Sequence, residues 1–247
     1  LLSESPKAPL GNFPVVIHSS AGGTLIHEAI GHSLEADAVQ RGISPVYHGR
    51  KGEKVATSSI TILDDPTLSG KRGSYLLDGE GNPAERVVLI EEGVLKDYLY
   101  DFSTAIKDRR ISNGHGRRES YQVPPVPRMG ITYLAPGKED PRQIIEALSR
   151  GILVKKMGGG QVNTANGDFV FEITEGYWVE RGKMQYPIQG ATLIGNGPRL
   201  LNEIERIGND LGFEAGTCGK EGQGVPVSDA MPTIFIPRLT VGGQGKE

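Results

Sequence analysis

Glycine and proline occur throughout the chain, and they limit the kinds of fold that it can adopt. The 247 residues include 35 glycines and 16 prolines, more than average usage would give. Because they are spread along the chain rather than gathered in one tract, they favour many tight turns over a disordered linker. The sequence shows no internal repeat, no low-complexity tract and no clear interior domain boundary.

Between these turns, the hydrophobic pattern predicts mainly strands, with few helices. Strands are predicted at residues 14–18, 58–62, 86–90, 94–100, 169–173, 176–184 and 233–236. Helices are predicted at 24–39, 140–148 and 198–207, with Thr24 and Asp140 as the caps of the first two. Gly93 in the turn makes 86–90 and 94–100 a hairpin, and Pro237 is expected to end the last strand. The predicted fold class is α+β, rich in largely antiparallel sheets.

Charge and composition exclude several classes of protein. The formal net charge is -3, with 27 basic and 30 acidic residues, so no basic excess indicates nucleic acid or an anionic membrane as partner. There is no apolar run of about 18 residues and no signal peptide at the start. The single cysteine, Cys218, cannot form an internal disulfide, so the cytoplasm is the expected compartment. The chain begins with Leu1 rather than methionine, and we expect a fragment.

One six-residue stretch, His27 to His32 with Glu28 beside the first histidine, has the residue types of a zinc-protease motif. In the familiar HExxH spacing, both imidazoles lie one turn apart on one helix face, and the glutamate acts as base. Here the second histidine is one residue further on, which separates the side chains by roughly 140° on an ideal helix. A regular helix would therefore prevent both from binding one ion. We expect the helix to be bulged or ended between Ile30 and His32, with Gly31 accommodating the distortion.

A catalytic zinc site needs three protein ligands, and the sequence leaves the third one open. The candidates are His18, His48, His115, Glu35 and Cys218. Glu35 follows His32 by three residues, as a carboxylate ligand or a hydrogen-bonding partner of a ligand should. Cys218 has glycines on both sides, which predicts a loop whose backbone approaches another group closely. A lone cysteine is also compatible with a small buried core residue, and the histidine pair with a polar helix face.

Several blocks in the same order along the chain resemble the TldD/PmbA (TldE) metallopeptidase family. The resemblance extends from about Pro14 to Gly243, and within the family the chain is similar to the catalytic, TldD-type subunit. The matching blocks are residues 27–37, 113–121, 158–162, 190–198, 207–211, 216–220 and 239–243. Together they are far more specific than the HExxxH motif alone.

The resemblance implies a complete catalytic site. It places zinc (Zn²⁺) on His27, His32 and Cys218, with Glu28 as general base. The implied activity is a zinc-dependent peptidase that hydrolyses peptide bonds in unfolded or extended peptides by metal-activated water. A different metalloenzyme with the same site, such as an amidase, and a non-catalytic interaction subunit are the alternatives.

The resemblance also implies a longer protein and a partner. Residues 1–13 would be the linker from a missing N-terminal domain, and 14–247 the metallopeptidase catalytic domain. The expected partner is a paralogous subunit of TldE/PmbA type that lacks the motif, in a heterodimer that encloses the active site, or else a second copy in a homodimer.

Three further features have open interpretations. The glycine run 158–160 is either a plain turn or a place where a substrate backbone adds to a sheet edge. Arg117 would bind a peptide carboxylate or Glu119, or face solvent. His115 and Glu35 would contact the metal ligands without binding the metal themselves.

Overall fold

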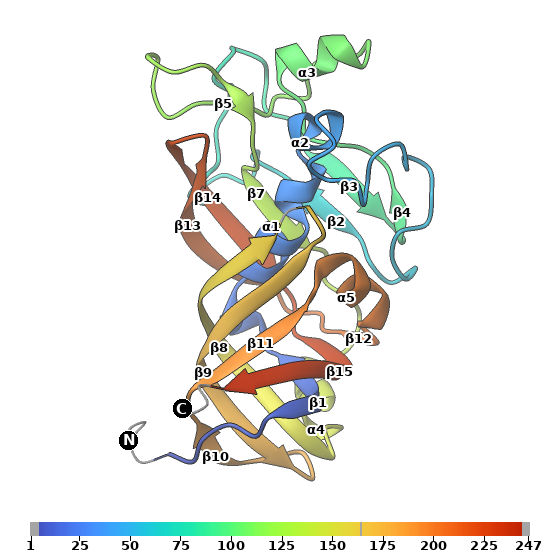
Figure 1. Ribbon diagram of the computed structural model, residues 1–247, viewed down its shortest axis with the longest axis vertical. Coiled ribbons are helices and arrows are strands. Elements are labelled where there is room, and N and C mark those ends of the chain that lie inside the picture. Colours follow the sequence, from blue (N-terminus) through green and yellow to red (C-terminus); the bar gives the residue numbers. More distant parts are fainter. Residues whose placement is uncertain (1–4, 164, 244–247) are drawn as a thin grey trace.

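In a computed structural model that describes residues 5–163 and 165–243, the strands form two large sheets, with helix α1 (Thr24–Ala29) between them (Figure 1). We call them the closed sheet and the open sheet. Helix α1 contacts strands of both. Most strand pairs are antiparallel, and the helices are short. The predicted α+β class with few helices is therefore confirmed.

The closed sheet occupies the lower half of Figure 1. It contains β1 (Gly11–Ile17), β8 (Arg150–Asn163), β9 (Asp168–Glu180), β10 (Lys183–Ile188), β11 (Ala191–Asn196), β12 (Arg206–Ile207) and β15 (Ile234–Gly243). The order is β1-β8-β9-β11-β15-β12, with β10 on β9, and β1 also pairs with β15. That last pairing closes β1, β8, β9, β11 and β15 into a ring, which removes the exposed edges that an open sheet would have.

The open sheet has the order β13-β14-β7-β2-β3-β4. These strands are β2 (Ile62–Asp64), β3 (Val87–Glu91), β4 (Val94–Leu95), β7 (Ile131–Leu134), β13 (Gly212–Lys220) and β14 (Gln223–Met231). A small ribbon of β5 (Gly116–Arg117) and β6 (Val126–Pro127) lies nearby. Strand β13 forms one end of this order and pairs along its length with β14.

The predicted helix 24–39 is interrupted, as the histidine spacing required. Helix α1 ends at Ala29, and Ile30 leaves helical geometry with φ -124° and ψ -51°. A 3₁₀ turn, η3 (Gly31–Leu34), carries His32, and α2 (Ala36–Gln40) follows after an extended Glu35. The expectation that the helix ends before His32 is confirmed.

The start of α1 differs from the prediction, because Gly23 and not Thr24 is its N-cap. A Cβ atom at residue 23 would lie 2.2 Å from the backbone nitrogen of Ala230 in β14. The Gly23 N–H donates a hydrogen bond of 2.9 Å to Asp229 Oδ1. Glycine therefore allows the first turn of α1 to rest directly on β14.

The remaining helices are shorter than predicted or were not predicted. They are η2 (Ser19–Ala21), α3 (Phe102–Lys107), α4 (Pro141–Glu146) and α5 (Gly197–Glu203). Asp140 caps α4 as predicted, by accepting a hydrogen bond from the Arg142 N–H. The third predicted helix, 198–207, ends at Glu203, and residues 206–207 pair with β15 instead.

The predicted strands differ from the structure mainly at their ends. Strand β2 begins only at Ile62, β4 ends at Leu95, and the predicted strands 169–173 and 176–184 correspond to one long strand, β9, and the start of β10.

The expected stop at Pro237 is wrong, because β15 continues through it. The register between β1 and β15 shifts between Phe13 and Val15, and such an irregularity accommodates a residue without an N–H donor.

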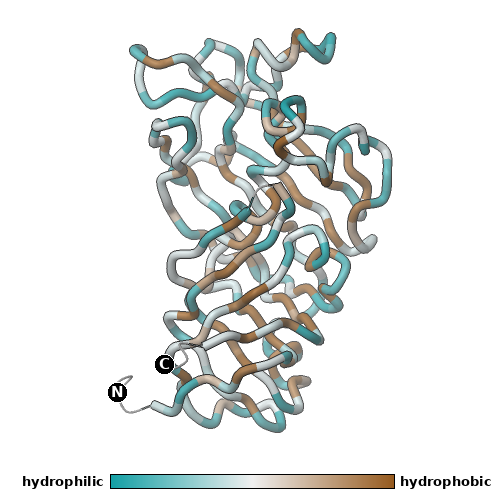
Figure 2. Tube along the Cα trace, in the orientation of Figure 1, coloured by the Kyte–Doolittle hydropathy of each residue, from teal (hydrophilic) through white to brown (hydrophobic). Residues whose placement is uncertain are grey.

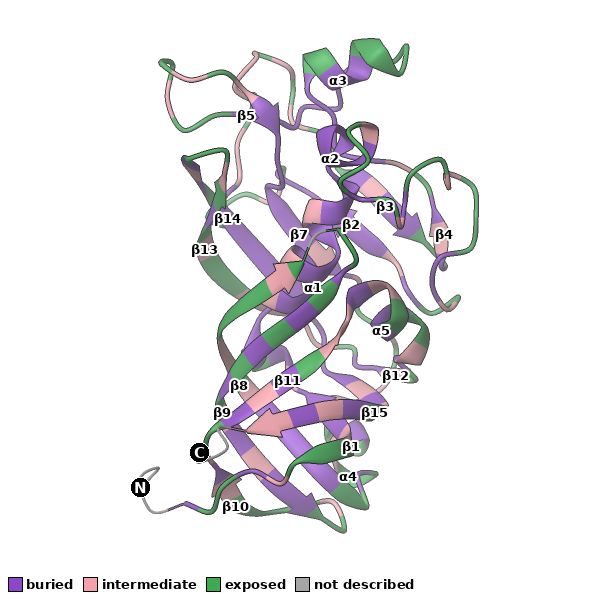
Figure 3. Cartoon of the chain, viewed as in Figure 1, coloured by how far each residue is buried: buried purple, intermediate pink, exposed green. Residues whose placement is uncertain are grey.

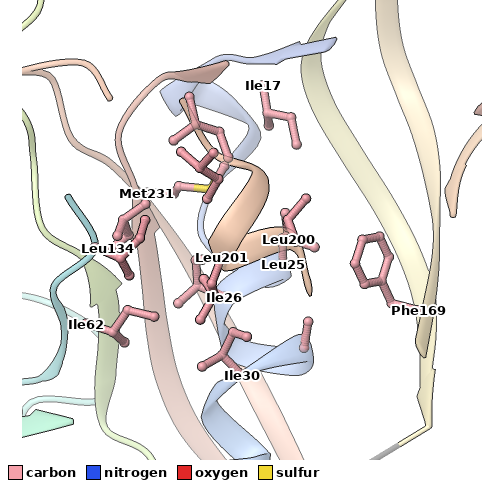
Figure 4. Close-up of a cluster of buried hydrophobic side chains, with 14 of the residues drawn as sticks. Ile17, Leu25, Ile26, Ile30, Ile62, Leu134, Phe169, Leu200, Leu201 and Met231 are labelled. Carbon is pink, nitrogen blue, oxygen red and sulfur yellow. The ribbon is translucent and has the colours of Figure 1, made fainter. Parts of the chain in front are cut away.

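The hydrophobic core joins the two sheets through α1. Figure 4 shows Leu25, Ile26 and Ile30 within a cluster of buried hydrophobic side chains that come from several elements. The other labelled members of this cluster are Ile17, Ile62, Leu134, Phe169, Leu200, Leu201 and Met231. Hydrophobic segments follow the strands in Figure 2, and the same segments are buried in Figure 3. Within the described ranges, no helix is both long and apolar enough to cross a membrane.

Replacing Gly23 with alanine tests the seating of α1 on β14. We expect Gly23→Ala to lower the free energy of unfolding by about 1–3 kcal/mol, because the added methyl overlaps backbone that cannot yield. Gly159 is the matched control, since a Cβ there meets nothing within 4 Å. Urea unfolding should show that Gly159→Ala is neutral or stabilising, whereas equal effects of both changes would contradict the close approach.

Candidate metal centre

Three side chains from distant parts of the chain meet beside α1. They are His27 on α1, His32 on η3 and Cys218 on β13, and their ligand atoms all lie within 4.8 Å of one another. The Cys218 sulfur lies 3.5 Å from His32 Nε2. The two imidazole rings are 5.1 Å apart and nearly perpendicular. The structure thus brings together the three residues predicted as metal ligands.

The end of α1 explains how two histidines five residues apart can face one point. A continuous helix would direct them to different faces. At Ile30 the backbone departs from the helix, and the following 3₁₀ turn has a different angular step per residue. His32 therefore turns back towards the side of α1 that carries His27.

Cys218 lies in the middle of β13, so the predicted loop is wrong. It is only 3% exposed and pairs with Val225 of β14. The fully buried Arg128 donates hydrogen bonds to the carbonyl oxygens of Cys218 on β13 and Gln223 on β14. The thiol is therefore fixed by a paired strand and a guanidinium group.

Glu28 is the more accessible member of the centre. Its side chain is 39% exposed, and its Oε2 lies 3.9 Å from His32 Nε2. It lines a cavity of about 160 Å³ together with His27 and Cys218, and a second cavity of about 360 Å³ together with His32. A molecule that enters either cavity can reach this carboxylate.

Glu35 contacts His32 from the side opposite to Cys218. Its Oε2 lies 3.1 Å from His32 Nδ1 and 3.0 Å from Lys220 Nζ. Burial alone would raise its pKa, but the charges of His32 and Lys220 lower the pKa to about 2. Glu35 is therefore an ionised hydrogen-bond partner of His32 and does not belong to the group of converging ligand atoms.

The other candidates for the third ligand have different neighbours. His115 is fully buried, with one ring nitrogen on Asp64 and the other on the Asn113 carbonyl oxygen. His18 bonds to Ser20, and His48 bonds to the Val39 carbonyl oxygen. These histidines lie outside the cluster with His27.

Two other expectations are corrected by the structure. Arg117 is buried, stacks over the Tyr75 ring, and donates to the carbonyl oxygens of Met129 and Pro226, so it faces neither solvent nor Glu119. The glycine run 158–160 is not a turn, since it lies within β8 and pairs irregularly with β9.

The electrostatics of the centre favour a thiolate. Burial would raise the pKa of Cys218, but hydrogen bonds from His27 and His32 lower the pKa to about 5. Burial likewise opposes a charge on His32, yet Glu35 and Cys218 raise its pKa well above the ordinary value. Burial raises the pKa of nearby Asp229 to about 6, with the negative charges of Glu214 and Glu28 adding to the effect and His27 opposing it.

Sequence reasoning missed three residues of this region. Lys220 has a recognisable signal, because residues two apart on a strand share a face, as do Cys218 and Lys220. Asp229 and Arg128 come close only through the pairing of β13 with β14 and through the chain around β6. No local sequence pattern predicts the contacts of Asp229 and Arg128.

The donor set fits a zinc ion. Two neutral imidazoles and one thiolate are ligands that zinc takes in tetrahedral sites with an open position. The buried Nδ1 of His27 has no hydrogen-bond partner among the described residues. The ring is therefore not committed to the protein's own hydrogen-bond network through this atom.

Comparison with known proteins shows the family of the chain. Residues 10–243 match the family described as PmbA/TldA metallopeptidase C-terminal domain. The chain belongs to the PmbA/TldD metallopeptidase family. A Buchnera aphidicola protein named Metalloprotease TldD homolog is 45% identical over 97% of this chain and 50% of its own length. The expected family is therefore confirmed.

One further relative and one solved structure extend the comparison. A Saccharolobus solfataricus protein named Zinc metalloprotease TldD homolog is 33% identical over 98% of this chain and 54% of its own length. The crystal structure of a Thermotoga maritima protein superposes with a TM-score of 0.81 at 27% identity, covering 96% of this chain and 51% of the other. The chain thus spans about half the length of the relatives it matches.

The titration of Cys218 tests the electrostatics of the centre. In metal-free protein, the ultraviolet absorbance of the thiolate should show a midpoint near pH 5, against an ordinary value of about 8.5. Because the folded pKa is the lower one, the thiolate contributes stability above about pH 8.5 that is lost as the pH falls through the folded pKa.

Cys218→Ser supplies the baseline for this titration. His32→Ala should move the midpoint upwards, because one of the two hydrogen bonds to sulfur is lost. A wild-type midpoint at the ordinary thiol value would contradict the described contacts.

Proposed function

We propose that this chain is the catalytic region of a zinc-dependent peptidase, with His27, His32 and Cys218 as ligands and Glu28 as general base. The observation that carries the proposal is the convergence of two imidazoles and one thiol next to an accessible carboxylate. The names of relatives in the family, one of which includes zinc, support it.

A zinc ion in such a site supplies Lewis acidity and lowers the pKa of its bound water towards roughly 7. The chain's own part is to bind, orient and move protons. Glu28 lies at the meeting point of the two cavities, where it can accept a proton from water and return it to the leaving amine. With Nδ1 of His32 bonded to Glu35, the Nε2 atom beside Cys218 would be the one available to a metal ion.

The geometry supports unfolded or extended peptides as the substrate class. The smaller cavity is lined by residues 214–218 of β13, which is the end strand of the open sheet. An extended peptide can add to the edge of such a strand by main-chain hydrogen bonds, with no requirement for a particular side chain. A folded domain would not enter a cavity of about 160 Å³.

The whole enzyme extends beyond this chain. We propose an N-terminal domain ahead of this chain and a motif-lacking paralogue or a second copy as partner, in the cytoplasm. The linker would lie before β1, because residues 11–13 of the expected linker 1–13 belong to that strand. Support comes from the half-length coverage of the relatives and from large apolar side chains that are left exposed. These include Leu76, Ile111 and Tyr121, which are 83–90% exposed.

Glu28→Ala separates catalysis from metal binding. In the full-length protein with its partner, we expect this change to leave the zinc content intact and to lower the hydrolysis of an unstructured peptide by about 100- to 10,000-fold, because the general base is lost. Full peptidase activity in Glu28→Ala would rule out the assigned role.

His27→Ala and Cys218→Ser should each lose zinc. Metal analysis of purified protein measures the effect, and a chelator should abolish hydrolysis by the wild type. His48→Ala is the matched control, since His48 is exposed and bonds only to the Val39 carbonyl oxygen. Retention of one zinc per chain in Cys218→Ser would contradict the proposed ligand set.

A further inference from the structure

Lys220 is a partly buried lysine, 14% exposed, whose ammonium group has three partners. Its Nζ donates to Asp37 Oδ1 at 2.7 Å, to the Pro127 carbonyl oxygen at 2.9 Å and to Glu35 Oε2 at 3.0 Å. An ammonium group has three N–H donors, so these contacts use all of them. The side chain is therefore fixed in position as firmly as a lysine can be.

This lysine and the predicted thiolate ligand come from the same strand. Cys218 and Lys220 are two residues apart on β13, and alternate residues of a strand share a face. Cys218 contacts Nε2 of His32, whereas Lys220 contacts the carboxylate that lies against Nδ1 of the same ring. Strand β13 therefore reaches both nitrogens of His32, one directly and one through Glu35.

The Glu35 carboxylate meets Lys220 and His32 through the same oxygen atom. Its Oε2 accepts both contacts, and its Oε1 is buried without a hydrogen-bond partner among the described residues. Its backbone is extended between η3 and α2, so no helix ladder aligns its side chain. Among the hydrogen bonds of the described residues, those with Lys220 and His32 direct the carboxylate.

We propose that Lys220 and Glu35 form one positioning unit for the metal ligand His32. Lys220 holds the Glu35 carboxylate against Nδ1 of His32, which fixes the orientation and tautomer of the ring and directs Nε2 to the metal. The inference rests on the proposed function, because it assumes that His32 is a ligand. Both residues act through His32, as positioning residues of a metal ligand.

The test measures zinc affinity in the full-length protein by competition with a chromophoric chelator. Lys220→Met keeps the length of the side chain and removes the ammonium group, and it should weaken zinc binding by about 10- to 100-fold, the usual loss for a partner of a ligand. Lys183→Met, at an exposed position on β10, is the control and should leave the affinity unchanged. Lys220→Arg should restore part of the affinity, because the positive charge returns.

Glu35→Gln provides a second approach in case Lys220→Met does not fold. It leaves Lys220 paired with Asp37 and Pro127 while removing the carboxylate charge at His32. It should weaken zinc binding over the same range. In cobalt-substituted protein, both variants should keep the thiolate-to-metal charge-transfer band and shift the ligand-field bands, since Cys218 stays bound and the contact to His32 changes.

The outcomes separate this inference from the proposed function. Wild-type protein that binds no zinc would refute the proposed function itself. Wild-type protein that binds zinc, with unchanged affinity and cobalt spectra in Lys220→Met and Glu35→Gln, would overturn the positioning role and leave the proposed function standing. Weaker binding with shifted ligand-field bands supports the role.

Discussion

The close approach of α1 to β14 at Gly23 is the contact on which the centre depends. No other residue type fits there, because a Cβ would overlap the backbone of Ala230. Strand β14 pairs directly with β13, so the depth at which α1 lies on β14 sets the separation of His27 and Cys218. Buried side chains such as Leu25 and Ile26, each worth about 1.5–3 kcal/mol when fully buried, hold the helix in this position.

The break at Ile30 is the second requirement, and it could be predicted from the sequence. The spacing of His27 and His32 excludes a regular helix through both, and the backbone does leave helical geometry at Ile30. The reason for Gly31 could not be predicted. Its φ is not in the left-handed region, and its role is to leave space, since a Cβ there would lie 2.0 Å from the sulfur of Met129. Met129 belongs to a distant segment, and only tertiary packing places it there.

Local patterns predicted part of the local structure, whereas strands β7, β11, β13 and β14 were not predicted. The hairpin of β3 and β4 turns at Glu92 and Gly93, both with positive φ, as a tight two-residue turn requires. Such local patterns did not predict which strands pair with each other. Pro237 was expected to end a strand that continues, and Cys218 was expected in a loop. The first expectation failed because β1, far away in the sequence, pairs with β15 on both sides of Pro237. The second failed because the neighbouring strand β14 pairs with the segment around Cys218 in a hairpin.

The central claim concerns the identity of the atoms that hold the metal. The most direct measurement is a zinc X-ray absorption spectrum of the zinc-loaded full-length protein. With Cys218, His27 and His32 as ligands, it should show one sulfur at about 2.3 Å and two imidazole nitrogens at about 2.0–2.1 Å. A spectrum without a sulfur neighbour, or with a single imidazole, would contradict the account.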